Sequence, residues 1–193
     1  MKKKYIIILF ILLFILLFPI KFHYKDGGTI EYRSLTYKII KWNSLDEYSD
    51  NGVKTGTEIH FFPYNFKPID YFREVRPPRF SLIYKDKKYY SNLLSYCWKN
   101  DYKALCVDTL GPEDLNYKSI IEVDKNEIMN YGLFIPVSYI NLIDENGKSI
   151  DKVEYNNELE TIKVPNVTGI YYLEVYYKCD EGSVSYSFKL NIK

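Results

Sequence analysis

The sequence predicts a mainly β protein with three parts: an N-terminal transmembrane helix (residues 1–22), a small β-rich membrane-proximal unit (residues 23–76) and a C-terminal β-sandwich (residues 77–193). Aromatic residues make up 18% of the chain, with 21 tyrosines, and aromatic side chains favour pleated sheets. Short stretches of alternating apolar and polar residues recur between turn sequences, without a convincing helical period. One long uncharged stretch at the N-terminus is the exception.

The predicted transmembrane helix rests on residues 5–20, which carry no charge and follow three lysines. The stretch is shorter than the ~20 apolar residues that span a bilayer, but residues 21–24 can lie at the membrane interface. Residues 19–26 lack the small residues of a signal peptidase site, which favours an uncleaved signal-anchor over a cleaved signal peptide. The lysines place the N-terminus in the cytoplasm, so we expect a single-pass protein of the cell membrane whose C-terminal portion is extracytoplasmic.

In the membrane-proximal unit we expect strands and one helical turn. TIEYRSLTYKIIKW (residues 29–42) is typical of one or two strands and TGTEIHFFP (residues 55–63) of another, with the polar turn DEYSDNG between them. A helical turn is predicted after Pro68, and Pro77-Pro78 predicts a stiff junction to the next unit.

The polar turn also matches a calcium-binding loop loosely, because five residues fall on EF-hand positions: Glu47, Ser49, Asn51, Gly52 and Glu58. β patterns rather than helices flank this stretch, so a solvated hairpin turn is the preferred interpretation.

Hairpins are predicted throughout the sandwich. SVSYSFKLNIK (residues 183–193) alternates apolar and polar side chains and is predicted to pair with residues 169–179 across the turn Asp180-Glu181-Gly182. RFSLIYKDKKYY predicts a second hairpin, Asn146-Gly147 marks the turn of a third, and LETIKVP predicts a short strand that Pro165 ends.

Cys97 and Cys106 lie nine positions apart around a polar middle. In a hairpin with residues 100–103 as its loop, the two cysteines face each other with Cα atoms roughly 4.5–5.5 Å apart, which suits a disulfide. Disulfides persist outside the cytoplasm, so we expect a Cys97–Cys106 disulfide, with reduced thiols or a metal site as the alternatives. Cys179 shares a strand face with Leu173 and Val175 and is predicted to be a small core residue.

Two stretches resemble the opening of a group of uncharacterised secreted or membrane-anchored proteins of Gram-positive bacteria. They are YKDGGTIEYRSLTYKIIKWN (residues 24–43) and GTEIHFFPYNFKPID (residues 56–70). Two further stretches resemble the Ig-like portion of many of these proteins: SYCWK, CVD and GP within residues 95–112, and residues 167–193. The resemblance implies that the sandwich is Ig-like, and it implies no activity. Lipid-anchored members carry an acylated cysteine that this chain lacks, which favours the helical anchor.

Charge and motifs argue against several classes of function. Beyond the three N-terminal lysines, acidic side chains slightly outnumber basic ones, so no basic face for nucleic acid is indicated. GxSxG, HExxH, a glycine-rich phosphate loop and paired CxxC motifs are absent, so we expect no enzyme, no cofactor and no metal. His60, between Ile59 and Phe61, is interpreted as structural. The alternative is a cell-envelope enzyme or metal-dependent accessory protein that uses His60 and nearby carboxylates.

Binding is the class of function that remains. Doubled tyrosines at positions 89–90, 171–172 and 176–177 place one ring on each face of a strand, and exposed tyrosine suits recognition of a protein or glycan. We therefore expect a membrane-tethered, extracytoplasmic, non-enzymatic binding or interaction module whose partner is a protein or a cell-envelope glycan.

Overall fold

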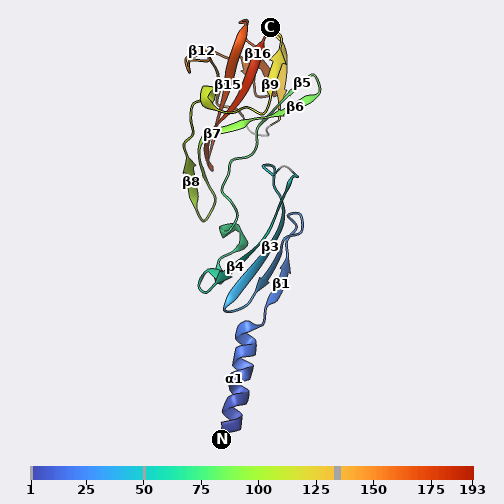
Figure 1. Ribbon diagram of the computed structural model, residues 1–193, viewed down its shortest axis with the longest axis vertical. Helices are drawn as coiled ribbons and strands as arrows, with labels where there is room; N and C mark the ends of the chain where they lie inside the picture. The colour runs from blue at the N-terminus through green and yellow to red at the C-terminus, as the bar shows by residue number, and fades with distance from the viewer. Residues whose placement is uncertain (1, 50, 133–135) are drawn as a thin grey trace. The chain divides into compact units, whose positions relative to one another are not determined.

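The computed structural model describes residues 2–49, 51–132 and 136–193 and is mainly β, with sheets that are largely antiparallel (Figure 1). The chain divides into two compact units, Met1–Arg73 and Glu74–Lys193, and each is described by itself. The division lies before the Pro77-Pro78 pair, so these two prolines belong to the second unit.

The first unit begins with helix α1 (Lys2–Leu17), whose side chains beyond the lysines are apolar on every side. A hydrogen bond of 2.8 Å from Phe18 N to Phe14 O closes its final turn, and Pro19 then stops the helix because proline has no backbone N–H. The chain continues as strand β1 (Ile20–His23), so the predicted helix over residues 1–22 is wrong at its C-terminal end. Among the described residues, no helix is both long enough and apolar enough to cross a membrane.

The first unit also contains an antiparallel meander of four strands in chain order: β1, β2 (Ile30–Arg33), β3 (Tyr37–Leu45) and β4 (Val53–Phe61). Strands β2, β3 and β4 lie where the sequence predicts them, whereas β1 occupies residues that were assigned to the anchor and its flank. The turn before β4 lies where expected too, although Asp50 within it is outside the described residues.

Short 3-10 turns cover one face of this sheet. They are η1 (Tyr64–Phe66) and η2 (Ile69–Tyr71), and η2 is the helical turn predicted after Pro68. Ile69 packs against Ile40 and Trp42 of strand β3, and these three residues form the small apolar core of the unit. The alternation of buried and exposed residues along β3 therefore sets which face of the sheet is covered.

The second unit contains two sheets. One has the strand order β13-β14-β10-β5-β6 and the other β12-β11-β15-β16-β7-β8, with β9 running parallel to β16. The strands of the first sheet are β5 (Ser81–Tyr84), β6 (Lys87–Tyr90), β10 (Ile128–Tyr131), β13 (Tyr155–Asn156) and β14 (Thr161–Lys163). The strands of the second are β7 (Asn92–Lys99), β8 (Ala104–Val107), β9 (Ile120–Val123), β11 (Tyr139–Ile143), β12 (Ser149–Lys152), β15 (Gly169–Cys179) and β16 (Gly182–Ile192).

The hairpins predicted from the sequence are confirmed. β15 and β16 pair along their whole length, from Gly169 opposite Ile192 to Cys179 opposite Gly182. Gly182 is required here, because its φ is +153° and a side chain would collide with the carbonyl oxygen of Cys97. The β5–β6 and β11–β12 hairpins also form where expected.

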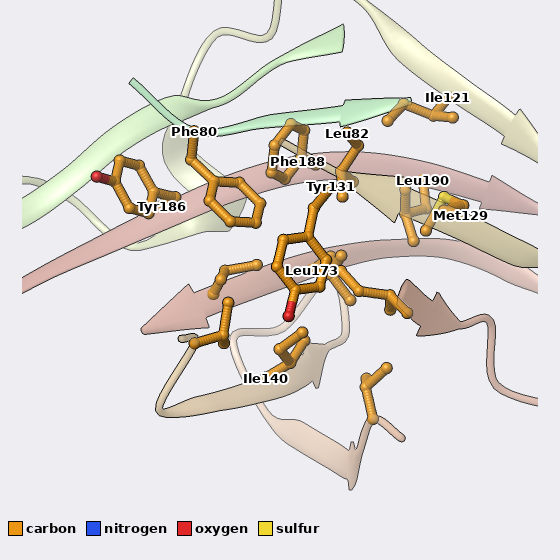
Figure 2. Close-up of a cluster of buried hydrophobic side chains, with 14 of the residues drawn as sticks. Phe80, Leu82, Ile121, Met129, Tyr131, Ile140, Leu173, Tyr186, Phe188 and Leu190 are labelled. Carbon is orange, nitrogen blue, oxygen red and sulfur yellow. The ribbon is translucent and has the colours of Figure 1, made fainter. Parts of the chain in front are cut away.

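The two sheets of the second unit share one hydrophobic core. Figure 2 shows side chains of both sheets in this core, among them Leu82 from β5 and Leu190 from β16. Phe80 lies at the centre of an aromatic group, with ring centroids 5.6 Å from Tyr131, 5.3 Å from Tyr186 and 5.9 Å from Phe188. A core of this size gives the second unit the rigidity to position surface side chains.

Candidate functional site

A pocket of about 250 Å³ opens in the second unit where strand β16 changes its neighbour. β16 pairs with β7 as far as Ser187, opposite Asn92, and with β9 from Lys189, opposite Ile120. Phe188 lies between the two registers, and strand β6 and the segment before β9 supply further walls. The pocket therefore follows from the topology, because two strands share one edge of β16 and leave space at their junction.

The lining of this pocket is strongly basic. Five of the residues that line it are cationic, and none of the described residues that line it is acidic: the five are Arg79, Lys87, Lys88, Lys118 and Lys189. Within the part of the chain that the structure describes, Lys87, Lys88 and Lys189 form no ion pair. Like charges gathered in a concave site focus a positive potential, which favours an anionic ligand. We call these five residues and the space between them the basic pocket.

Aromatic rings hold several of the cations in place. The guanidinium carbon of Arg79 lies 3.9 Å from the ring centroid of Tyr90, and the Nζ of Lys88 lies 5.0 Å from the same centroid. The Nζ of Lys87 lies 4.9 Å from the ring of Tyr89. Cation–π contacts leave the N–H groups of Lys87 and Lys88 available to a ligand, so these contacts orient the two ammonium groups without neutralising them.

Tyr117 fixes the wall beside β16. Its hydroxyl donates a hydrogen bond of 2.9 Å to the carbonyl oxygen of Pro112 and lies 2.5 Å from Oγ of the fully buried Ser187. Burial raises the pKa of Tyr117 to about 12, so the hydroxyl stays protonated at neutral pH. The ring packs 5.5 Å from Tyr172, over which Lys189 Nζ lies at 5.3 Å. Lys189 is thereby held against the same wall.

The predicted disulfide between Cys97 and Cys106 is confirmed. The β7–β8 register places the two residues opposite each other, with Cα atoms 4.0 Å apart, and the loop between the strands is the predicted one. Both cysteines are exposed. Cys179 is a free thiol that packs, half-buried, against the core of the second unit, in keeping with the predicted role of a small core residue.

His60 lies in the first unit on strand β4. Its Nε2 is 3.1 Å from Oε2 of Glu58, and its ring stacks on Phe72 with 3.8 Å between centroids. His23, the second histidine, lies on β1, and strands β2 and β3 separate it from β4. His60 therefore combines a carboxylate contact with an aromatic stacking contact, and the two histidines are not brought together.

The residues of the calcium-like pattern do not converge on one point. Ser49 Oγ donates a hydrogen bond of 2.5 Å to Oδ1 of Asn51 within the turn, whereas Glu58 lies along β4, opposite Ile40 and in contact with His60. Among the described residues, no group of three His, Cys, Asp or Glu side chains is placed to hold a metal ion. The stretch forms the hairpin turn that was the preferred interpretation.

The first unit also buries a charged network that the sequence did not predict. Glu31 and Lys38 are completely buried, and Lys38 Nζ lies 3.3 Å from Oε1 of Glu31. Arg33 Nε donates to the same oxygen at 2.6 Å, and the Tyr24 hydroxyl donates to Oε2 at 2.8 Å. Lys38 also donates to the carbonyl oxygen of Lys67, which ties the covering segment to the sheet. The donors and acceptors satisfy one another, so we assign this network a structural role.

Comparison with known proteins adds no relative. No protein-family model matches the chain, and no curated protein or solved structure is significantly similar to it. The basic pocket is therefore interpreted from its own residues. Sequence reasoning missed it, because the cations are far apart in the chain and only the adjacent Lys87 and Lys88 give a local sign of positive charge.

Proposed function

We propose that this protein is a membrane-tethered, extracytoplasmic, non-enzymatic binding module, and that its basic pocket holds the phosphate group of a cell-envelope glycan. The observation that carries the proposal is the set of five cationic side chains around one pocket that has no acidic residue in its described lining. Lysine and arginine donate charge-assisted hydrogen bonds to anionic oxygens, and phosphate presents more such oxygens than a carboxylate does.

The size and rings of the pocket favour a small unit of the ligand. Its volume of about 250 Å³ is below the roughly 300–1,000 Å³ of most small-molecule sites, so it suits a compact group such as one sugar phosphate. Tyr90 is 48% exposed although Arg79 and Lys88 lie over its ring, so the exposed part of the ring can contact a sugar. We therefore assign the phosphate to the cations and the sugar to Tyr90.

The proposed location has two supports. The Cys97–Cys106 disulfide is typical of proteins outside the cytoplasm. Helix α1 exposes apolar side chains on all sides, and such a surface is covered in a functioning protein, here by lipid under the proposal. An Ig-like fold for the second unit, and kinship with the Gram-positive group that the sequence resembles, are part of the same proposal.

The proposal is tested by titration calorimetry on the full chain in detergent micelles. Glucose 6-phosphate is the probe, glucose is the uncharged control, and inorganic phosphate and citrate separate phosphate recognition from general anion binding. We expect glucose 6-phosphate to bind and glucose not to bind. The double variant Lys87→Gln/Lys88→Gln is expected to lower the affinity about a hundredfold, since each lost charged hydrogen bond costs about 1.5 kcal/mol.

Lys178→Gln is the matched control, because Lys178 is exposed on β15 and does not line the pocket. It removes the same kind of charge from the same unit, and its affinity is expected to equal that of the native chain. Equal affinities in the Lys87/Lys88 and Lys178 variants would contradict the proposal, as would citrate binding as tightly as glucose 6-phosphate.

A second candidate function, a cell-envelope enzyme, rests on the 3.1 Å contact between His60 and Glu58. A histidine beside a carboxylate can act as a general base. The 3.8 Å stacking on Phe72 favours a structural role for the ring instead. If purified protein hydrolysed an envelope glycan, loss of that activity in His60→Gln with normal stability would support the enzyme.

A further inference from the structure

The first unit exposes a group of large apolar side chains at one end of its sheet. They are 46% to 69% exposed, and we call them the apolar rim: Leu35, Phe61, Phe62, Tyr64 and Phe66. Four of the five are aromatic, which makes the group unusual for a surface in contact with water. Clustered apolar surface of this kind marks a site where another phase or molecule is bound.

Three segments meet to form the rim. The backbone N–H of Phe62 donates to the carbonyl oxygen of Thr36 at 3.0 Å, which places the end of β4 beside the β2–β3 turn. The fully buried side chain of Asn65 donates to the carbonyl oxygen of Ser34 at 3.1 Å. Because Asn65 is anchored inward, its exposed neighbours Tyr64 and Phe66 are presented to the outside.

The rim lies where helix α1 ends. Thr36 Oγ1 donates to the carbonyl oxygen of Leu16 at 3.2 Å, and the Tyr37 hydroxyl donates to that of Leu17 at 3.2 Å. Helix α1 has 16 residues and so rises roughly 24 Å, whereas the hydrocarbon core of a bilayer is about 30 Å thick. The apolar rim lies at the C-terminal end of helix α1. It therefore extends the apolar surface of the helix toward the thickness of the hydrocarbon core.

Charge near the rim points to the headgroup layer. Lys67 is exposed and directly follows Phe66 of the rim, and Lys21 is exposed on β1 shortly after the end of helix α1. Aromatic side chains flanked by lysine are typical of segments at the interface of membranes that contain anionic lipids. We infer that the apolar rim docks into the interfacial layer of an anionic bilayer and seats the first unit directly on the membrane.

This inference rests on the membrane-tethered part of the proposed function and is independent of the basic pocket. It is tested with the full chain in vesicles of phosphatidylcholine and phosphatidylglycerol whose acyl chains carry bromine near the headgroup. Tryptophan is introduced at the rim by Phe62→Trp and, separately, by Phe66→Trp. Leu45→Trp is the matched control, because Leu45 is 76% exposed at the other end of β3. The emission of the native tryptophans is measured in the unsubstituted chain and is subtracted from that of each variant.

Each variant is first floated with the vesicles on a density gradient. We expect all variants to float, and we expect brominated lipid to quench Phe62→Trp and Phe66→Trp but not Leu45→Trp. If the chains float but the rim tryptophans are quenched no more than Leu45→Trp, the docking of the rim is overturned and the membrane tether is not. Rim tryptophans whose emission is blue-shifted but not quenched would also overturn the docking of the rim. That result would indicate that a second copy of the chain covers the rim. Chains that do not float would overturn both the tether and the rim.

Discussion

The Nζ atom of Lys38 lies 3.3 Å from Oε1 of Glu31, and both side chains are completely buried in the first unit. Removing ions from water costs free energy that only close pairing and further hydrogen bonds offset. Arg33 and Tyr24 provide those hydrogen bonds to Glu31, so the network depends on each of its members.

Lys38→Met is expected to lower the free energy of unfolding of the first unit by about 3 kcal/mol, because it leaves a buried carboxylate without one of its partners. Chemical denaturation of the full chain in detergent measures the change. Lys41→Met is the control, since Lys41 is exposed on the same strand. Equal stability of the two variants would show that the buried pair contributes nothing.

Acid is expected to destabilise the first unit through Glu31. Burial by itself raises the pKa of Glu31, but hydrogen bonds from Arg33 and Tyr24 and the charge of Lys38 outweigh it and hold the pKa below the ordinary 4.5. The stabilisation is therefore present above about pH 4.5 and is lost as the pH falls through the lower pKa of the folded state.

Thermal unfolding followed by Trp42 emission, in a Trp98→Phe background, measures this pH dependence. Trp42 belongs to the core of the first unit, so its emission reports on that unit. Glu31→Gln is expected to flatten the acid limb of the profile. An unchanged acid limb in that variant would assign the pH dependence to other carboxylates.

The Cys97–Cys106 disulfide is expected to stabilise the second unit by about 2–3 kcal/mol, because it closes a short loop in the unfolded chain. The double variant Cys97→Ser/Cys106→Ser should show this loss in denaturant, with faster hydrogen exchange in β8 and little change in β15. Cys179→Ser keeps the disulfide and serves as the control. Uniform acceleration of exchange through both sheets would contradict a local effect.

Tyr117→Phe is expected to weaken binding of glucose 6-phosphate severalfold and to lower the free energy of unfolding by about 1 kcal/mol. The hydroxyl of Tyr117 donates a hydrogen bond to the carbonyl oxygen of Pro112, and its removal also leaves the buried Ser187 without this partner. Calorimetry and denaturation measure the two effects. Tyr139→Phe is the control, because Tyr139 stacks on Tyr176 and neither residue lines the pocket. Unchanged affinity in Tyr117→Phe would show that this wall does not position the cations.

Local patterns in the sequence predicted the local structure well. The alternation along residues 183–193 predicted the pairing of β15 with β16, and the nine-residue spacing of Cys97 and Cys106 predicted both the register and the cross-link. These features depend on neighbours in the chain, which is where periodicity and turn chemistry are informative.

Features made by distant segments were not predictable in the same way. The basic pocket joins Arg79, Lys118 and Lys189, and nothing in their spacing indicates that β16 changes partner between β7 and β9. Lys38 looks like an ordinary polar position in a strand, and only the sheet pairing with β2 reveals that it is buried beside Glu31. Strand β1 was missed because its apolar residues continue the N-terminal stretch.

Strand β8 is the outermost strand on its side of the larger sheet, and a covalent bond joins it to β7. An open sheet edge is a template on which another chain can add a strand and start a fibre. Here that edge is four residues long and cannot peel away from its neighbour. The cystine therefore keeps β8 paired along the end of β7, an edge that reduction would leave free to open and pair with another chain.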